Sequence, residues 1–152
     1  METMKDVEST GPPVEILVVE DNMGDAYLLV KYLEHSRVRN HVTVVQDGVE
    51  ASDYLKKKEP YHEAKRPDLI FLDLNLPRKD GRVVLQEIKS DPDLKDIPVL
   101  VLTTSSWEQD VTEAYDYHAN LYIVKPTDLE QFLASMKYVE EVWLRGIVPS
   151  GR

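Results

Sequence analysis

The sequence predicts an α/β fold: a doubly wound parallel sheet of five strands that alternate with five helices. Short aliphatic runs, apolar nearly throughout, recur along the chain and are typical of strands buried on both faces of a parallel sheet. Segments with apolar residues at helical spacing separate them, and this alternation favours right-handed crossovers with helices on both faces. The chain has 152 residues, of which 42% are apolar and 30% charged, as expected for a single domain with its own core.

The first two strand–helix units occupy the N-terminal part of the chain. The strand Glu15–Val19 precedes a helix whose apolar residues recur at i, i+3, i+4 and i+7. The strand Val42–Val45 precedes a shorter helix over Gly48–Lys58. The apolar face of the first helix comprises Ala26, Leu29, Val30 and Leu33.

The third and fourth units carry signals for where their helices begin or end. The strand Asp68–Leu72 precedes a helix over Arg82–Lys89, which a following Asp-Pro pair stops because proline disfavours helical backbone at the residue before it. The strand Val99–Leu102 precedes a helix for which Ser105 and Glu108 form a capping signature. The apolar stripe of that helix comprises Val111, Ala114, Tyr115 and His118.

The fifth unit closes the alternation. The strand Leu121–Val124 precedes a helix that begins at Thr127, where Glu130 completes a capping box, and runs to Leu144. The last turns of this helix are apolar enough that we expect another surface to bury them, and exposed aromatic residues are typical of protein interfaces. We therefore expect a homodimer whose interface includes Tyr138, Val142 and Trp143.

The composition excludes several classes of function. The formal net charge is −10, from 28 acidic and 18 basic residues, so we expect binding neither to nucleic acid nor to membranes, since both need a basic face. The absence of cysteine excludes disulfide and thiolate chemistry. No signal-peptide or membrane-spanning stretch occurs. We expect a cytoplasmic protein with a tail over 1–13, one domain over 14–144 and a C-terminal tail over 145–152.

Charged and hydroxyl side chains follow the strands at the points where they end. In a parallel sheet of order 2-1-3-4-5, ligands bind beyond the carboxyl ends of the strands, at the crevice between strands one and three. Strand one ends in Glu20-Asp21, strand three in Asp73, strand four in Thr103 and strand five in Lys125. Three carboxylates, one hydroxyl and one ammonium are thus predicted to meet at one rim.

This set of side chains predicts a magnesium-dependent phosphoacceptor. Three neighbouring carboxylates cannot all stay ionised without a cation, and oxygen ligands with open water positions suit Mg²⁺. Asp73, alone on the central strand, is the expected nucleophile, because aspartyl-phosphate formation is an established mode of covalent catalysis. Lys125 would balance the charge of a phosphoryl group, and Thr103 would donate a hydrogen bond to it.

These motifs resemble the receiver domain of two-component response regulators over roughly Val14 to Leu144. The resemblance implies the flavodoxin-like (βα)5 fold with strand order 2-1-3-4-5. Its pieces are VEDN at 19–22, FLDLNLP at 71–77, Gly81, VLTTS at 101–105 and VKP at 124–126. Finer features are similar to the single-domain receivers that partner bacterial and cyanobacterial phytochromes; they are DLNLPRKDGR at 73–82, KKKEPYHEAKRPDL at 56–69 and HANLYIVKP at 118–126.

The resemblance assigns a role to each residue of the rim. It implies that Asp73 accepts a phosphoryl group from a phosphohistidine of a sensor histidine kinase. It implies that Asp21 binds Mg²⁺ directly, that Glu20 helps through water and that the backbone carbonyl of Asn75 completes the protein ligands. Thr103 takes the family's hydroxyl role. Lys125 takes its lysine role and is expected to precede a cis proline bond.

The resemblance also implies a switch and a mode of output. When the phosphoryl group draws Thr103 inward, the ring of Tyr122 can follow and alter the face formed by the fourth helix, the fifth strand and the fifth helix. We expect a stand-alone receiver that signals by dimerisation or partner binding. It would catalyse only its own phosphorylation and dephosphorylation and is not expected to be an enzyme acting on a metabolite.

The sequence leaves three alternative functions open. An aspartate-nucleophile phosphatase needs a second aspartate two residues after the nucleophile, where this chain has Asn75, which cannot transfer a proton. A flavodoxin-like cofactor binder needs a phosphate loop after strand one, where Glu20-Asp21 would repel phosphate. A receiver-like module could also bind partners without phosphorylation. The sequence identifies neither the kinase nor the downstream target.

Overall fold

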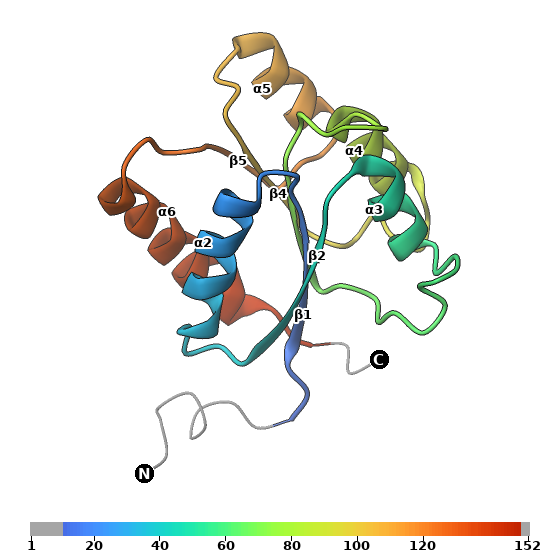
Figure 1. Cartoon of the computed structure of the whole chain (residues 1–152), viewed down its shortest axis with the longest axis horizontal. Helices are drawn as coiled ribbons and strands as arrows, with labels where there is room; N and C mark the ends of the chain where they lie inside the picture. The colour runs from blue at the N-terminus through green and yellow to red at the C-terminus, as the bar shows by residue number, and fades with distance from the viewer. Residues whose placement is uncertain (1–10, 150–152) are drawn as a thin grey trace.

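A five-stranded parallel sheet forms the centre of the protein. The computed structural model describes residues 11–149, and Figure 1 shows the strands running through the middle of the molecule. The sheet order is β2-β1-β3-β4-β5, which confirms the predicted topology. The strands are β1 (Val14–Val19), β2 (Asn40–Val45), β3 (Leu69–Leu72), β4 (Val99–Thr103) and β5 (Leu121–Val124).

Within residues 11–149, five α-helices cover the two faces of the sheet. In Figure 1, α2 and α6 lie on one side of the strands, and α3 and α4 lie on the other. Ala114 of α5 packs in the same core as α3 and α4. Among residues 11–149, no helix is long and apolar enough to cross a membrane. The helices are α2 (Met23–Glu34), α3 (Gly48–Leu55), α4 (Gly81–Ser90), α5 (Glu108–Asp116) and α6 (Leu129–Val142), and a 3₁₀ turn η1 (Leu144–Gly146) follows α6.

Alternate residues of each strand build two separate cores. On β1, Leu17 and Val19 pack beneath α3 and α4, whereas Ile16 and Val18 pack beneath α2 and α6. All of these side chains are nearly inaccessible to solvent because helices cover both faces. Burial on both sides explains why the strands are continuous apolar runs in the sequence.

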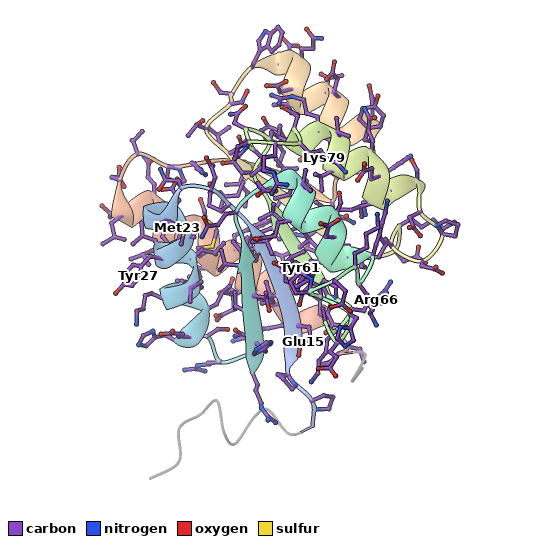
Figure 2. All side chains as sticks on the ribbon, turned by 45° about the vertical axis from the view of Figure 1, so that its right-hand side comes forward. Glu15, Met23, Tyr27, Tyr61, Arg66 and Lys79 are labelled. Carbon is purple, nitrogen blue, oxygen red and sulfur yellow. The ribbon has the colours of Figure 1, made fainter. Side chains whose placement is uncertain are left out.

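The long segment between α3 and β3 contains neither a helix nor a strand, yet several contacts attach it to the domain. The ring of Tyr61 packs edge-on against Tyr54 of α3, with their centroids 5.3 Å apart. The guanidinium of Arg66 donates to the backbone carbonyl of Asp93, 3.2 Å away. Figure 2 shows Tyr61 and Arg66 on the same side of the molecule.

Several predicted helix ends were wrong. The α6 helix is capped by Asp128, whose side chain accepts from the backbone of Gln131, and not by Thr127. Ser105 does not cap α5, because Trp107 is the N-cap residue and makes no side-chain capping bond. His118 lies beyond α5 with φ of 67°, so it does not extend the helical stripe. In each case, the backbone conformation within one helical turn determines where the helix begins or ends.

Candidate functional site

The register of the sheet brings the ends of the central strands to one rim. Val19 of β1 pairs with Leu72 of β3, which pairs in turn with Val101 of β4. The residues that follow β1 and β3, Glu20 and Asp73, therefore emerge side by side. The backbone N–H of Asp73 donates to the carbonyl of Val19, 3.1 Å away, and fixes this alignment.

Asp73 is buried and hydrogen-bonded from three sides. Its Oδ1 accepts from the Thr103 hydroxyl at 2.8 Å and from the Asn75 backbone at 3.0 Å, and its Oδ2 lies 2.9 Å from Nζ of Lys125. Burial raises the pKa of Asp73, but the hydrogen bonds from Lys125, Asn75 and Thr103 outweigh it, so the pKa falls below its ordinary value. These hydrogen bonds therefore favour the ionised form of the Asp73 carboxylate and fix its orientation.

Lys125 supplies the positive charge of this site. Its Nζ forms ion pairs with Glu20, with Asp25 at 2.8 Å and with Asp73 at 2.9 Å. Burial lowers the pKa of Lys125, but bonding to the three carboxylates raises it above its ordinary value. The lysine is therefore charged, and one ammonium bridges acids that would otherwise repel one another.

Asp25 is a site residue that the sequence reasoning missed. It lies in the first turn of α2, where Asn22 caps the helix by accepting from the Asp25 backbone at 3.0 Å. An acidic residue in a first turn is commonly explained by the helix dipole, so the sequence alone does not distinguish that role from pairing with Lys125. The sequence signal for this position is the helix cap at Asn22, which places Asp25 in the first turn of α2.

Three carboxylates at the rim can hold a cation. One oxygen from each of Glu20, Asp21 and Asp73 lies within 4.8 Å of the others, with Glu20 and Asp73 buried and Asp21 exposed. Burial, together with the charge of Asp73, raises the pKa of Glu20 to about 7 although Lys125 lies beside it. These oxygen donors carry more negative charge than the one lysine neutralises. Such a set of oxygen ligands fits a hard divalent cation such as Mg²⁺. The role of the Asn75 carbonyl stays a prediction.

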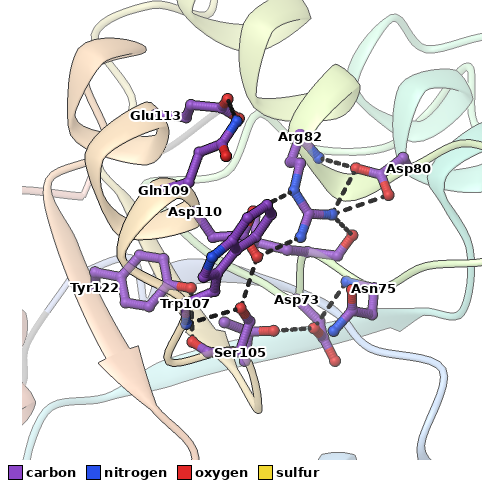
Figure 3. A network of polar contacts seen from close by, with 12 residues as sticks. Asp73, Asn75, Asp80, Arg82, Ser105, Trp107, Gln109, Asp110, Glu113 and Tyr122 are labelled. Atoms are coloured by element: carbon purple, nitrogen blue, oxygen red, sulfur yellow. Dashed lines mark hydrogen bonds and ion pairs between the residues drawn. The ribbon is translucent and has the colours of Figure 1, made fainter.

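Tyr122 connects the rim to the loop between β4 and α5. Its hydroxyl donates to the carbonyl of Ser105 at 2.8 Å, so the half-buried ring is held against this loop. Figure 3 shows Tyr122 and Ser105 beside a network that includes Asp110 and Arg82, two residues that the sequence reasoning did not single out. Side chains that meet only in three dimensions leave no local sequence signal.

The predicted interface residues lie apart from the rim, at the C-terminal end of α6. Tyr138 and Val142 are each 51% exposed. Trp143 is half-buried and packs against the core beneath α2 and α6, and its Nε1 is buried without a hydrogen-bond partner among the described residues. Part of the predicted surface therefore belongs to the domain's own core.

The peptide bond between Lys125 and Pro126 is trans, so the expected cis bond was wrong. Within the described part of the chain, the cis bond is Glu59-Pro60. The trans form of an X-Pro bond is intrinsically favoured by about 0.5–1 kcal/mol. Lys125 reaches Asp73 from this trans backbone, with its own N–H bonded to the carbonyl of Thr103 at 2.6 Å.

The fold and the geometry of the rim agree with a known protein family. Residues 16–137 match the model of the response regulator receiver domain. The chain belongs to this family. Asp73, Thr103, Lys125 and the pair Glu20-Asp21 lie together at one rim of the sheet, and their roles there stay predictions.

Two response regulators illustrate the similarity of this chain to known receivers. Response regulator Rcp1 of Synechocystis sp. is 42% identical over 140 residues, which cover 92% of this chain and 95% of Rcp1. The crystal structure of Mn²⁺-bound Rcp1 covers 90% of this receiver with a TM-score of 0.86 and aligns over 99% of its own chain. The phosphorylated cyanobacterial phytochrome response regulator RcpA is 51% identical, covers 88% of this receiver and 95% of its own chain, and has a TM-score of 0.84.

Proposed function

We propose that this receiver accepts a phosphoryl group on Asp73 from the phosphohistidine of a sensor histidine kinase, with a phytochrome as the kinase. The observation that carries the proposal is the placement of Asp73 directly after the central strand β3, where Thr103 and Lys125 both donate to its carboxylate. The phytochrome link rests on similarity to RcpA, a cyanobacterial phytochrome response regulator.

The proposed transfer is a displacement at phosphorus. An oxygen of Asp73 attacks the phosphorus, the bond from phosphorus to the histidine nitrogen breaks, and the imidazole leaves with the bonding electron pair. The product is an acyl phosphate on Asp73. In the reverse half of the cycle, a water oxygen attacks the phosphorus and the bond to Asp73 breaks, which restores the carboxylate and releases inorganic phosphate.

The side chains around Asp73 prepare both steps. Glu20, Asp21 and Asp73 would hold Mg²⁺, which offsets charge on the transferring oxygens when it is bound. Lys125 keeps the Asp73 oxygens ionised and supplies a fixed positive charge beside the incoming group. Thr103, wholly buried, presents a hydroxyl that can exchange its bond to Asp73 for one to a phosphoryl oxygen.

The output is proposed to be a change in the face formed by α5, β5 and α6. Tyr122 lies on β5 with its hydroxyl on the β4–α5 loop, so a movement of Thr103 and this loop reaches the surface through the ring. The exposed Tyr138 and Val142 of α6 support a homodimer as one form of this output. Trp143, which is half-buried against the domain core, is proposed to contribute to the interface at the same end of α6.

Phosphotransfer from a labelled kinase tests the proposal. A bacteriophytochrome-type kinase carrying labelled phosphohistidine is mixed with the wild type and with Asp73→Asn, with Mg²⁺ or with EDTA. We expect label on the wild type only when Mg²⁺ is present and none on the variant. Equal labelling of the variant would refute Asp73 as acceptor, and steady turnover of a phosphate ester would favour the phosphatase alternative.

A further inference from the structure

A charged clamp joins α4 to α5 beside the phosphoacceptor rim. The guanidinium of Arg82 on α4 binds both carboxylate oxygens of Asp110 on α5, with Nε 3.0 Å from Oδ1 and Nη2 2.7 Å from Oδ2. The side chain of Asp110 is only 7% exposed. The bond from Arg82, followed by one from Ser105, lowers the pKa of Asp110. Two-pronged pairing of a buried carboxylate fixes orientation as well as charge.

The clamp continues into the β4–α5 loop through Ser105. The Ser105 hydroxyl donates to Oδ2 of Asp110 at 2.6 Å, and the Ser105 carbonyl accepts from the Tyr122 hydroxyl at 2.8 Å. Ser105 lies two residues after Thr103, the hydroxyl donor to Asp73. Asp110 therefore holds the short loop that carries both the end of β4 and the anchor of the Tyr122 ring (Figure 3).

Arg82 also reaches the loop that follows Asp73. Its Nη1 donates to Asp80, the N-cap residue of α4, at 3.0 Å, and lies 3.5 Å from the carbonyl of Leu74. One guanidinium thus contacts the loop after β3 and, through Asp110, the loop after β4. Asp73 begins the first loop and Thr103 directly precedes the second, so the separation of the two loops determines how Asp73 meets its hydroxyl donor.

We propose that Arg82 and Asp110 are positioning residues for the phosphorylation of Asp73, acting through Ser105. The clamp sets the β4–α5 loop so that Thr103 faces Asp73 and the Tyr122 hydroxyl finds its acceptor. The inference rests on the proposed function, because the consequence of the positioning is a rate of phosphoryl transfer. Neither residue touches the acceptor carboxylate among the described contacts, so neither is a catalytic residue.

A double-mutant cycle distinguishes positioning from general stabilisation. Rates of phosphorylation by acetyl phosphate with Mg²⁺ are measured for Asp110→Asn, Ser105→Ala and the double variant. We expect each single variant to be slowed by about threefold to tenfold, as for residues coupled in one network. We expect Asp110→Asn to cause no further slowing once Ser105 is alanine, because Asp110 acts through that hydroxyl. Multiplicative slowing in the double variant would overturn the proposal.

Two further variants sharpen the test. Arg82→Lys keeps the positive charge but loses the planar guanidinium and its bidentate hydrogen bonds to Asp110. We therefore expect it to slow phosphorylation as Asp110→Asn does. Gln109→Ala is the matched control, because Gln109 makes an exposed hydrogen bond to Glu113 on the same helix, at 3.0 Å, without contacting Ser105. Its rate is expected to equal that of the wild type. Unchanged rates in Arg82→Lys would contradict the need for two-pronged pairing.

Hydrogen exchange in the unphosphorylated protein separates failure of this inference from failure of the proposed function. We expect amides of residues 104–107 to exchange faster in Asp110→Asn and Arg82→Lys than in the wild type, whereas β1 amides stay unchanged. If the wild type accepts no phosphoryl group, the proposed function is refuted while this measurement still decides whether the clamp holds the loop. Unchanged exchange over 104–107 would show that it does not.

Discussion

At the residue scale, the rim is governed by the sharing of one ammonium among several carboxylates. Lys125 contacts Glu20, Asp25 and Asp73, and its side chain is only 11% exposed. A buried charge that loses its partner keeps the full cost of its desolvation. Removing the lysine therefore leaves the carboxylates without a compensating positive charge, whereas binding of a divalent cation supplies that positive charge instead.

Lys125→Gln is expected to lower the free energy of unfolding at pH 7 by about 1–3 kcal/mol in EDTA. The difference from the wild type should narrow on addition of Mg²⁺, because a cation that binds only the folded state stabilises it, and the variant should bind Mg²⁺ more tightly. Urea unfolding with and without Mg²⁺ measures both effects. A difference that is independent of Mg²⁺ would contradict the placement of lysine and metal in one electrostatic site.

The pKa of Asp110 gives a prediction about pH. Bonds from Arg82 and Ser105 lower this pKa in the folded state, so the ionised group stabilises the fold above its unfolded-state value near 4, and the stabilisation disappears as pH falls through the folded-state pKa. Asp110→Asn should therefore cost about 1–3 kcal/mol at pH 7, with the difference from wild type closing below about pH 4.

Unfolding of the wild type and Asp110→Asn is compared by urea titration between pH 3 and 7. Asp116→Asn provides a control on the same helix, because Asp116 is exposed. This exposed change is expected to stay within about 0.5 kcal/mol of the wild type throughout. A constant difference between wild type and Asp110→Asn at all pH values would exclude ionic pairing as its origin.

At the element scale, the loop from β3 to α4 approaches its own strand so closely that only glycine fits at its end. A Cβ on Gly81 would collide with the backbone carbonyl oxygen of Asp73 and with the backbone of Leu74. The N–H of Gly81 also donates to the Leu74 carbonyl at 2.8 Å. The start of α4 thus packs directly against the backbone of Asp73.

Gly81→Ala is expected to destabilise the fold by about 1–3 kcal/mol, because backbone atoms must move to admit the methyl group. It should also slow phosphorylation, since the displaced atoms belong to Asp73. Gly146→Ala is the control, because nothing lies within 4 Å of its Cβ position. Thermal unfolding and acetyl-phosphate labelling of both variants check the prediction, and an unperturbed Gly81→Ala would contradict the close approach.

The elements that could be predicted from sequence are those whose signal is local. The strands β3 and β4 are short apolar runs because both of their faces are covered, so Leu69–Leu72 was found within one residue. Helix ends were less predictable, because the choice between Thr127 and Asp128 as the cap of α6 depends on the backbone path from β5. The apolar pattern does not encode that path.

The candidate site likewise contains residues that the sequence predicts and residues that it does not. Asp73, Thr103 and Lys125 lie at strand ends, so strand order alone predicts that they meet. Asp25 and the clamp residue Arg82 lie on helices, and their partners are set by how the helices rotate and pack on the sheet. Single-sequence reasoning has no measure of that rotation, and these residues emerged only from the structure.

At the scale of the whole molecule, the exposed end of α6 bears on assembly. Tyr138 and Val142 are four residues apart and share one face of the helix. Trp143 packs on the domain core, so truncating it would confuse loss of assembly with loss of folding. Surface substitutions therefore test the dimer more cleanly.

Val142→Asp is expected to convert a homodimer to a monomer without unfolding it, because a charge placed in an apolar interface loses its hydration without gaining a partner. The matched control is Leu133→Asp, nine residues earlier and thus on the opposite side of α6, where the leucine is 45% exposed. Light scattering of the three proteins, with and without phosphorylation, measures the mass. A wild-type mass of one chain in both states would contradict the proposed dimer.

The phosphoacceptor itself is tested most directly by mass spectrometry of the intact protein after incubation with acetyl phosphate and Mg²⁺. The wild type is predicted to gain the mass of one phosphoryl group, located on the peptide that contains Asp73, and to gain none in EDTA or as Asp73→Asn. A phosphoryl group on the Asp73→Asn variant, or on a different peptide of the wild type, would contradict the account.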